Sequence, residues 1–403
     1  MSAPRADLAA SAHADTQAGV VADAGQHAVP WQDGNGERAD AGVRTHDGAD
    51  DPGRLRAPGR RRGGGRGSRA EQPVVPPAEF QSYYNRPIVK APGWREDIPA
   101  YLFLGGLAAG SSLLGAGGDL TGRPGMRRAG RVAGLGAISA SFGFLVHDLG
   151  RPSRFVHMLR VAKPTSPMSM GTWLLTAYGP LAGIAAAAEA LPVVRRRKNR
   201  IGRLARGPLG KILGGSARPA GLVAAAVAPA VASYTAVLLS DTAMPSWHDA
   251  YPELPFVFCG SAAAASGGLQ MITTSTAEAT PARRLAVAAA VAELVVSRRM
   301  EHRMGLTGEP FGLGHAGTLS TLARVLTAGG ATLAALAGRR SRVASVIAGA
   351  ALLGGSACTR FAVFEAGVAS ARDPRYTVIP QRRRADAALA ARSPNGTSPV
   401  EPV

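Results

Sequence analysis

Apolar and polar residues alternate along this chain in long blocks rather than at single positions. Between Ile98 and Gly367 the sequence contains eight apolar blocks joined by short polar loops. Each block is close to the roughly 20 residues that a helix needs to cross the hydrocarbon core of a bilayer. The predicted spans are residues 98–118, 129–148, 169–191, 219–240, 254–275, 282–298, 316–337 and 343–367. The pattern predicts an all-α integral membrane protein, a helical bundle of about eight transmembrane helices.

Alanine and glycine dominate the apolar blocks. Small residues let helix backbones approach closely, and in lipid such packing holds helices together. The sixth block differs, because it carries Glu293 and ends in Ser297, Arg298 and Arg299. We therefore expect a compact bundle whose sixth helix is short or partly exposed to water.

Polar segments flank the predicted bundle on both sides. Residues 1–79 are rich in Ala, Gly, Asp and Arg without apolar periodicity, which predicts a disordered, basic tail. An arginine pair in this tail is not followed by an apolar segment, so a signal peptide is not predicted. Residues 80–97 are predicted to be an ordered approach to the first helix, 98–367 the transmembrane domain, and 368–403 a polar C-terminal tail.

Loop charge predicts the orientation of the bundle. The loop at residues 195–218 carries nine Lys and Arg residues and no acid, so it is expected inside. The loop at 241–253 carries three acids and no Lys or Arg, and is expected outside. Alternation then puts the start of the first helix outside. The 149–168 loop conflicts with this assignment, because it falls outside although it holds four basic residues.

The formal charge of +19 is a second consequence of these loops. In a membrane protein it indicates basic loops facing anionic lipid rather than a nucleic-acid partner. The two cysteines form no CxxC motif, so neither an iron–sulfur cluster nor a zinc or other metal site is predicted in this chain. No two histidines are expected to face each other within spans, so no haem is predicted.

Polar residues gather where the first four predicted helices meet the outer face. If these helices pack as a bundle, acids, bases, hydroxyls and rings surround a cleft that is open to lipid. A quinone headgroup needs such donors, ionisable groups for protons and an apolar path for its tail. As single residues, Tyr101 and Trp247 also suit interfacial aromatics, and His147 and Asp148 suit a helix cap paired with Arg151. The residues of this group are Glu96, Asp97, Tyr101, His147, Asp148, Arg151, Lys163, Ser166, Ser169, Thr172, Trp173, Tyr234, Asp241, Trp247 and His248.

A few ionisable residues lie elsewhere in the spans, where each is costly and hence a functional candidate. Glu293, Arg324, Arg360 and Glu365 are expected either to form internal ion pairs that fix packing or to belong to a proton path. Towards the inner side, Asp119 is expected to cap the first helix. Glu189 is expected at the lipid interface.

Four stretches of the sequence are similar to a known family. They are residues 83–87 (YYNRP) with 98–110, residues 147–152 (HDLGRP) with 163–173 (KPTSPMSMGTW), residues 233–235 with 245–248, and residues 364–376. On these stretches the chain resembles the NrfD/PsrC family, the membrane subunits of polysulfide-reductase-type complexes, and above all its actinobacterial branch. The resemblance covers about residues 80–385.

The resemblance implies an eight-helix anchor in the cell (cytoplasmic) membrane that holds no redox cofactor of its own. Such an anchor exchanges electrons between a membrane quinone, here expected to be menaquinone, and an iron–sulfur partner subunit connected to a molybdopterin catalytic subunit, as in anaerobic respiration. Tyr234 matches a family tyrosine that bonds the quinone. Tyr101 stands where the polysulfide-reductase branch has a histidine, and the asparagine which that branch has near Ile98 is absent here.

The resulting hypothesis is a quinone-binding subunit that is not catalytic alone. Two alternatives stay open: a proton-translocating channel or secondary transporter, which would use Glu293 and Arg360, and a purely structural anchor. In the main hypothesis the expected quinone-binding residues are Tyr101, Tyr234, His147, Asp148 and Trp173. The candidates for proton transfer are Glu96, Asp97, Asp148 and Glu293, and those for orienting groups or meeting the partner are Arg151, Lys163, Trp247 and His248.

Overall fold

A computed structural model describes residues 88–151 and 153–392 of the chain, and in this part it contains helices and no strand. The predicted tail at residues 1–79 lies outside the described residues. The elements are α1 (Asp97–Leu120), α2 (Pro124–Asp148), α3 (Arg154–Met158), α4 (Pro167–Arg195), α5 (Arg200–Arg206), α6 (Pro208–Ser240), α7 (Pro245–Asp249), α8 (Leu254–Thr273), α9 (Thr280–Met304), the 3-10 helix η1 (Gly305–Gly312), α10 (Gly314–Leu336), α11 (Arg342–Arg372) and α12 (Arg375–Arg392).

Seven of the long helices are apolar enough to cross a membrane: α1, α2, α4, α6, α8, α10 and α11. They confirm the prediction of an all-α, multi-pass membrane protein. The sixth predicted span corresponds to α9, which is long enough but carries too many charges to count as apolar.

Contacts at the two ends of α9 show that it nevertheless runs the full length of the bundle. Near its C-terminus, Arg303 bonds Glu253 at the start of α8, with 2.7 Å between Nη2 and Oε2. Its N-terminus follows the turn at the other end of α8, where the carbonyl of Ala277 accepts a hydrogen bond from Arg123. Because α8 spans the membrane, α9 crosses beside it. Arg283 and Glu293 are buried against protein, whereas Arg284, Arg298 and Arg299, nearer the two ends of α9, are exposed.

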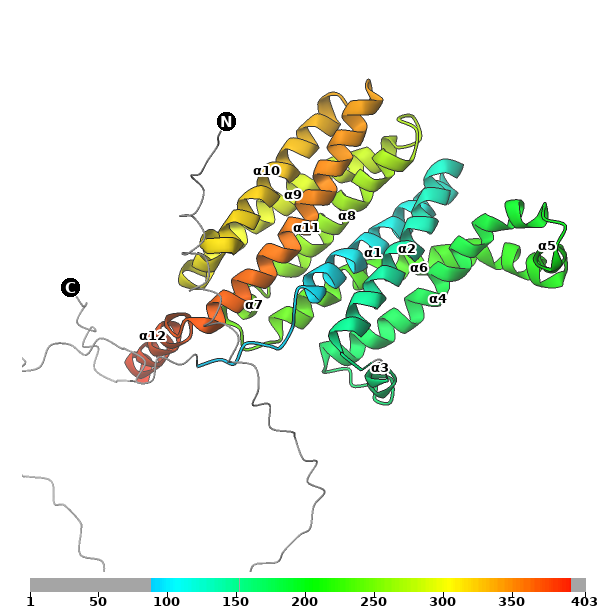
Figure 1. Cartoon of the computed structure of the whole chain (residues 1–403). Helices are drawn as coiled ribbons and strands as arrows, with labels where there is room; N and C mark the ends of the chain where they lie inside the picture. Colours follow the sequence, from blue (N-terminus) through cyan, green and yellow to red (C-terminus); the bar gives the residue numbers. More distant parts are fainter. Residues whose placement is uncertain (1–87, 152, 393–403) are drawn as a thin grey trace, which may run out of the picture. The chain divides into compact units, whose positions relative to one another are not determined.

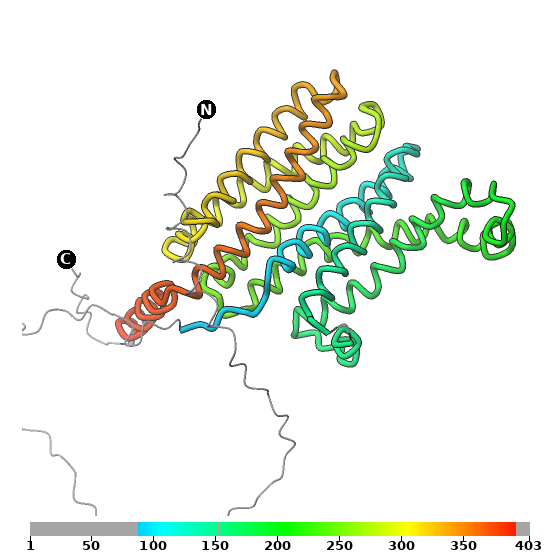
Figure 2. The backbone as a smooth tube through the Cα atoms, in the orientation of Figure 1, coloured from blue at the N-terminus to red at the C-terminus, as the bar shows by residue number. Residues whose placement is uncertain are grey.

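The eight long helices form two groups that lie side by side (Figures 1 and 2). The first half consists of α1, α2, α4 and α6, and the second half of α8, α9, α10 and α11. Helix α1 joins them, since it packs against α2 and α6 as well as α8 and α11. We call the end where α1 begins the predicted outer end and the opposite end the predicted inner end.

Glycines set the spacing of neighbouring helices in both halves. A Cβ atom on Gly268 of α8 would lie 2.7 Å from the carbonyl oxygen of Gly349 on α11. On Gly130 of α2 it would lie 2.6 Å from the backbone nitrogen of Gly115 on α1. The backbones therefore touch at these points, which is the close approach expected from small residues in lipid.

The clearest difference from the predicted boundaries is at α6. This helix begins at Pro208 rather than near residue 219, because residues 208–218 continue the helix although Lys211 and Arg218 make them polar. Hydropathy locates the part of a helix that lies in lipid, whereas hydrogen bonding locates its true end. Proline suits the first turn of a helix, where its missing N–H is not needed.

Candidate functional site

Two tyrosines meet at the predicted outer end of the first half. The hydroxyl of Tyr101 on α1 is hydrogen bonded to the hydroxyl of Tyr234 on α6. Both line a cavity of about 240 Å³, here called the tyrosine cavity. Its lining is otherwise apolar except for Asp148, Arg154 and Thr172. The lining residues are Trp94, Ile98, Tyr101, Leu145, Asp148, Leu149, Arg154, Met158, Met168, Gly171, Thr172, Leu175, Tyr234 and Leu238.

The backbone around the tyrosines fixes where their rings point. The carbonyl of Tyr101 accepts a hydrogen bond of 3.0 Å from Ser141 Oγ on α2, which holds α1 in register with that helix. The ring of Tyr234 lies over Gly171 of α4, where a Cβ atom would come within 2.5 Å of Tyr234 Cε2. The glycine of the PTSPMSMGTW stretch thus makes room for this ring.

Each tyrosine hydroxyl has one hydrogen to donate and can also accept. One hydrogen is used within the Tyr101–Tyr234 pair. The other stays free to be donated to a further acceptor, so the pair offers one donor within an apolar cavity.

The ionisable residues predicted for this site lie around the cavity, and one of them lines it. Asp148 lines the cavity, and its Oδ1 accepts a hydrogen bond of 3.4 Å from the backbone N–H of Arg95. Asp97 Oδ2 lies 2.8 Å from Nδ1 of His147, whose side chain is 75% exposed. Glu96 is exposed just before α1. The structure thus pairs His147 with the acid of α1 instead of placing it in the cavity.

The loop between α2 and α4 covers one side of the site. Trp173 does not line the tyrosine cavity, and its indole N–H donates to the carbonyl of Val161 over 3.3 Å. The backbone N–H of Lys163 donates to Ser169 Oγ over 3.0 Å. The side chains of Arg151 and Lys163 are exposed. These contacts hold the loop onto α4 and leave its cations on the surface.

Arg154, in the same loop, lines the cavity although sequence analysis did not select it. The short helix α3 turns it back towards α2, where its Nη1 donates to the carbonyl of Leu149. In the sequence, the one hint that Arg154 could share a site with the selected residues is its position three residues after Arg151. A charge count treats both residues as loop cations and does not distinguish them.

Trp247 is completely buried, in contrast to the interfacial position considered from sequence. Its indole N–H donates to the carbonyl of Val363 on α11 over 2.6 Å. Its ring centroid is 5.9 Å from that of Trp94 and 5.7 Å from that of Phe364. Trp247 therefore joins the approach segment to the second half and has no surface for a partner. His248 beside it has Nδ1 at 3.0 Å from the carbonyl oxygen of Ser240.

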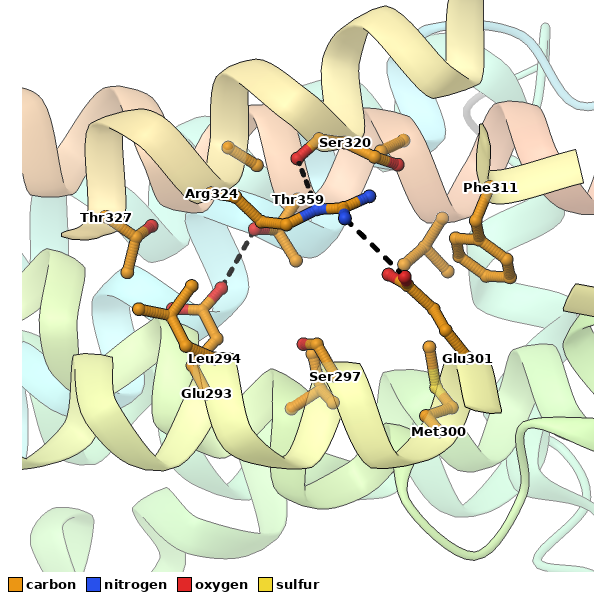
Figure 3. A pocket seen from close by; sticks show the side chains of 14 residues that line it. Glu293, Leu294, Ser297, Met300, Glu301, Phe311, Ser320, Arg324, Thr327 and Thr359 are labelled. Carbon is orange, nitrogen blue, oxygen red and sulfur yellow. Dashed lines mark hydrogen bonds and ion pairs between the residues drawn. The ribbon is translucent and has the colours of Figure 1, made fainter. Parts of the chain in front are cut away.

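Glu293 lies apart from this site, on α9 in the second half. It lines a different, smaller cavity together with Glu301 and Arg324 (Figure 3). Arg324 Nη1 lies 3.7 Å from Glu301 Oε2, so the ion pair of this region joins Arg324 to Glu301 and not to Glu293. The structure thus does not bring Glu293 together with the other predicted proton-transfer residues.

An ion-pair network lies at the predicted inner end of the first half. Glu189 Oε1 is 2.8 Å from Arg127 Nε and 2.9 Å from Arg131 Nη1. Arg131 Nη2 is also 3.3 Å from Asp119 Oδ2. With its side chain only 7% exposed, Glu189 is buried, and the expected lipid-interface position is wrong. The expected cap at Asp119 is likewise an ion pair.

Comparison with known proteins agrees with the fold. A family model described as polysulphide reductase, NrfD, matches residues 93–296, which include α1 to α8 and most of α9. The C subunit of the polysulfide reductase of Wolinella succinogenes is 31% identical over 186 residues, or 44% of the present sequence. The match spans 57% of that relative's length. Because the family match covers half of the sequence, this protein belongs to the NrfD family of multi-pass membrane proteins.

Proposed function

We propose that this chain is the quinone-reactive membrane subunit of an oxidoreductase complex in the cytoplasmic membrane. It would carry electrons between a membrane quinone, menaquinone in our proposal, and an iron–sulfur subunit that is connected to a molybdopterin catalytic subunit. The observation that carries the proposal is the pair of tyrosine hydroxyls inside an apolar cavity that lies between membrane-spanning helices.

The residues of the tyrosine cavity fit a quinone headgroup. The cavity of about 240 Å³ is smaller than the roughly 300–1,000 Å³ that enclose drug-sized ligands. It would therefore take a ring and leave a long tail outside. A second apolar hollow of about 290 Å³ shares Leu175 with it and runs between α2 and α4 past Ile138 and Phe142. This hollow offers an apolar path for the tail.

The polar residues of the tyrosine cavity and its apolar lining have separate roles in this proposal. The free hydroxyl hydrogen of the Tyr101–Tyr234 pair would be donated to a headgroup oxygen. Asp148 would hold or release a proton at the cavity wall, and Arg154 would orient that carboxylate. The apolar lining would exclude water. A bound quinone supplies the redox chemistry, taking up or releasing two electrons and two protons.

The partner subunits are proposed on two grounds. The name of the Wolinella relative makes that protein one subunit of a polysulfide reductase, and the family match extends this expectation to the present protein. In addition, the exposed cations of the α2–α4 loop and the exposed His147 provide a charged surface beside the tyrosine cavity. An iron–sulfur subunit docked there would bring its electrons close to the cavity.

A gentle detergent pull-down of the tagged protein tests the proposal directly. Bound lipids are extracted to quantify quinone, and co-purifying proteins are identified. We expect a quinone together with iron–sulfur and molybdopterin subunits. Partner subunits without quinone would favour a purely structural anchor. A lone protein without quinone would favour a transporter or channel, and either result would overturn the proposal.

Substitution of a single hydroxyl sharpens this test. Tyr234→Phe removes the hydroxyl that pairs with Tyr101, and a hydrogen bond lost from a buried site costs about 1–3 kcal/mol. We therefore expect bound quinone and quinone turnover to fall about tenfold while the partner subunits still co-purify. Tyr178→Phe is the matched control, because that buried phenol bonds Ser112 and Ala108 away from the cavity. Unchanged quinone binding in Tyr234→Phe would sink the assignment.

A further inference from the structure

Another cavity lies in the second half, lined mainly by α9, α10 and α11, with apolar and polar side chains in equal number (Figure 3). Its volume is about 40 Å³. Since one water needs roughly 10–15 Å³ of cavity volume, about three or four waters fit. We call it the Glu293 cavity. Its polar lining is Glu293, Ser297 and Glu301 from α9, Ser320, Arg324 and Thr327 from α10, and Thr359 from α11.

Glu293 is buried at one end of this polar lining, with 3% of its surface exposed. Its Oε1 is 2.8 Å from Thr359 Oγ1, whereas its Oε2 is buried without a hydrogen-bond partner among the described residues. Buried carboxylate oxygens normally have partners. An oxygen without one, on the wall of a cavity with room for water, points to exchange with that water.

The hydroxyl of Thr359 permits two protonation states of Glu293. Thr359 Oγ1 lies 2.8 Å from Glu293 Oε1 and 3.0 Å from the carbonyl oxygen of Gly355. A hydroxyl has a single hydrogen, so it can donate to only one of these acceptors at a time. When the hydrogen goes to Glu293, the carboxylate is stabilised. When it goes to Gly355, a protonated Glu293 can donate to Thr359 instead.

No cation neutralises Glu293 by direct contact in the described part of the protein. The nearby arginine of α11, Arg360, directs Nη2 to the carbonyl of Phe258 over 2.8 Å and stacks its guanidinium 3.6 Å above the Phe258 ring. On α9 and α10, Glu301 and Arg324 pair with each other. Helix α8, which packs Gly260 against Glu293, has Cys259 as its one titratable residue. Arg360 therefore acts on Glu293 only through space, without an ion pair. A carboxylate without a directly bound cation is costly within a membrane protein, and a bound proton removes that cost.

A polar path leads from Glu293 towards the predicted outer end. Glu293, Ser297 and Glu301 are four residues apart, so they share one face of α9, and the outermost two are separated by about 12 Å along the axis. Glu301 is 27% exposed and its partner Arg324 is 49% exposed. In the opposite direction, alanines of α9 pack against α8, α10 and Leu352 of α11 in an apolar cluster. The path therefore opens towards one end.

We propose that Glu293 is a proton-binding site that exchanges with water at the predicted outer end through the Glu293 cavity and Glu301. In the exchange, a hydrated proton is transferred to the carboxylate, where an O–H bond forms as one in the hydrated ion breaks, and the reverse step returns it by the same route. The site lies in the other half of the bundle from the tyrosine cavity. It does not depend on a bound quinone.

Infrared spectroscopy of the purified full-length protein in nanodiscs tests this proposal, because a protonated carboxyl has its own C=O stretching band. We expect a band that disappears reversibly at high pH, shifts on transfer to D₂O and is lost in Glu293→Gln. Glu189→Gln is the matched control and should leave the band unchanged, since Glu189 is ion-paired with two arginines. A band that survives in Glu293→Gln, or its absence from the unmodified protein, would overturn the proposal.

Two further variants separate the site from its route. Ser297→Leu fills the cavity between Glu293 and Glu301, so the band should remain while its shift in D₂O becomes at least tenfold slower. Thr359→Val removes the hydroxyl that contacts Glu293 and should move the band without abolishing it. This variant also reports on Glu293 if the glutamine variant does not fold. An equally fast D₂O shift in Ser297→Leu would refute the route, and loss of the band when sodium replaces potassium would show a sodium site instead.

Discussion

Glu189 in the first half and Glu293 in the second half are both buried carboxylates, but their surroundings differ. Glu189 lies at the predicted inner end against Arg127 and Arg131. Glu293 lies within the second half, has Thr359 as its partner and borders a water-sized cavity. Glu189 holds helices together through its ion pairs, whereas Glu293 has the surroundings that we propose for proton exchange. Burial alone does not distinguish them.

The two cavities extend this comparison. The tyrosine cavity of about 240 Å³ is lined mainly by apolar side chains and offers phenol hydroxyls to an organic ring. The Glu293 cavity of about 40 Å³ is much smaller, and half of its lining side chains carry hydroxyl, carboxylate or guanidinium groups, which suits water. Cavity size and lining together support the proposed quinone site in the first half and the proposed proton site in the second.

The largest expected effect comes from making the same substitution at both carboxylates. Glu189→Gln removes one of the two carboxylates that Arg127 and Arg131 share and leaves them Asp119, and breaking a buried pair costs up to about 3–5 kcal/mol. Glu293→Gln keeps an amide oxygen for Thr359, so the expected loss is below about 1 kcal/mol. Unfolding of both variants by titration with sodium dodecyl sulfate in mixed micelles measures the difference. A greater loss of stability in Glu293→Gln would reverse the comparison.

A smaller effect is expected where the first half makes room for Tyr234. In Gly171→Ala the new methyl group would lie 2.5 Å from Tyr234 Cε2, so the ring must shift. Overpacking of this kind costs about 1–3 kcal/mol, and the shift should also lower bound quinone in the pull-down.

The control for this variant is on the same helix. Gly183→Ala meets no atom within 4 Å and lies away from both hollows, and alanine favours a helix over glycine by about 1 kcal/mol. It should therefore leave stability equal or higher and quinone binding unchanged. If both variants lowered bound quinone equally, the contact between Gly171 and Tyr234 would not be its cause.

Much of the architecture could be predicted from sequence because membrane spans are encoded locally. The length of the apolar blocks predicts the spans. The convergence of helix ends at one face predicts that Tyr101 lies near Tyr234, and the two hydroxyls are hydrogen bonded in the structure. The span at α9 is the least apolar, and contacts within the second half account for some of its charges, such as Arg303 with Glu253.

Contacts that depend on helix rotation could not be predicted in this way. Hydropathy places Glu189 near a membrane surface, but only the packing of α2 against α4 reveals that Arg127 and Arg131 meet it. Likewise, an aromatic residue in a loop resembles an interfacial anchor, whereas Trp247 is buried by a short helix folded onto α11. A single sequence contains no signal for the rotation of one helix about its axis relative to another.

The smallest expected effect concerns the surface pair of His147 and Asp97 at the predicted outer end. His147→Ala removes a contact with Asp97 in which the histidine is 75% exposed, and exposed pairs of this kind contribute about 0–1 kcal/mol. The change in unfolding free energy should be within that range and should shrink further at high salt, which screens exposed charges. Unfolding at low and high ionic strength measures both quantities. A loss as large as that of Glu189→Gln, insensitive to salt, would show that the predicted outer end of the first half also depends on a buried ion pair. The charges near the tyrosine cavity would then stabilise the bundle in the same way as the buried network at the predicted inner end.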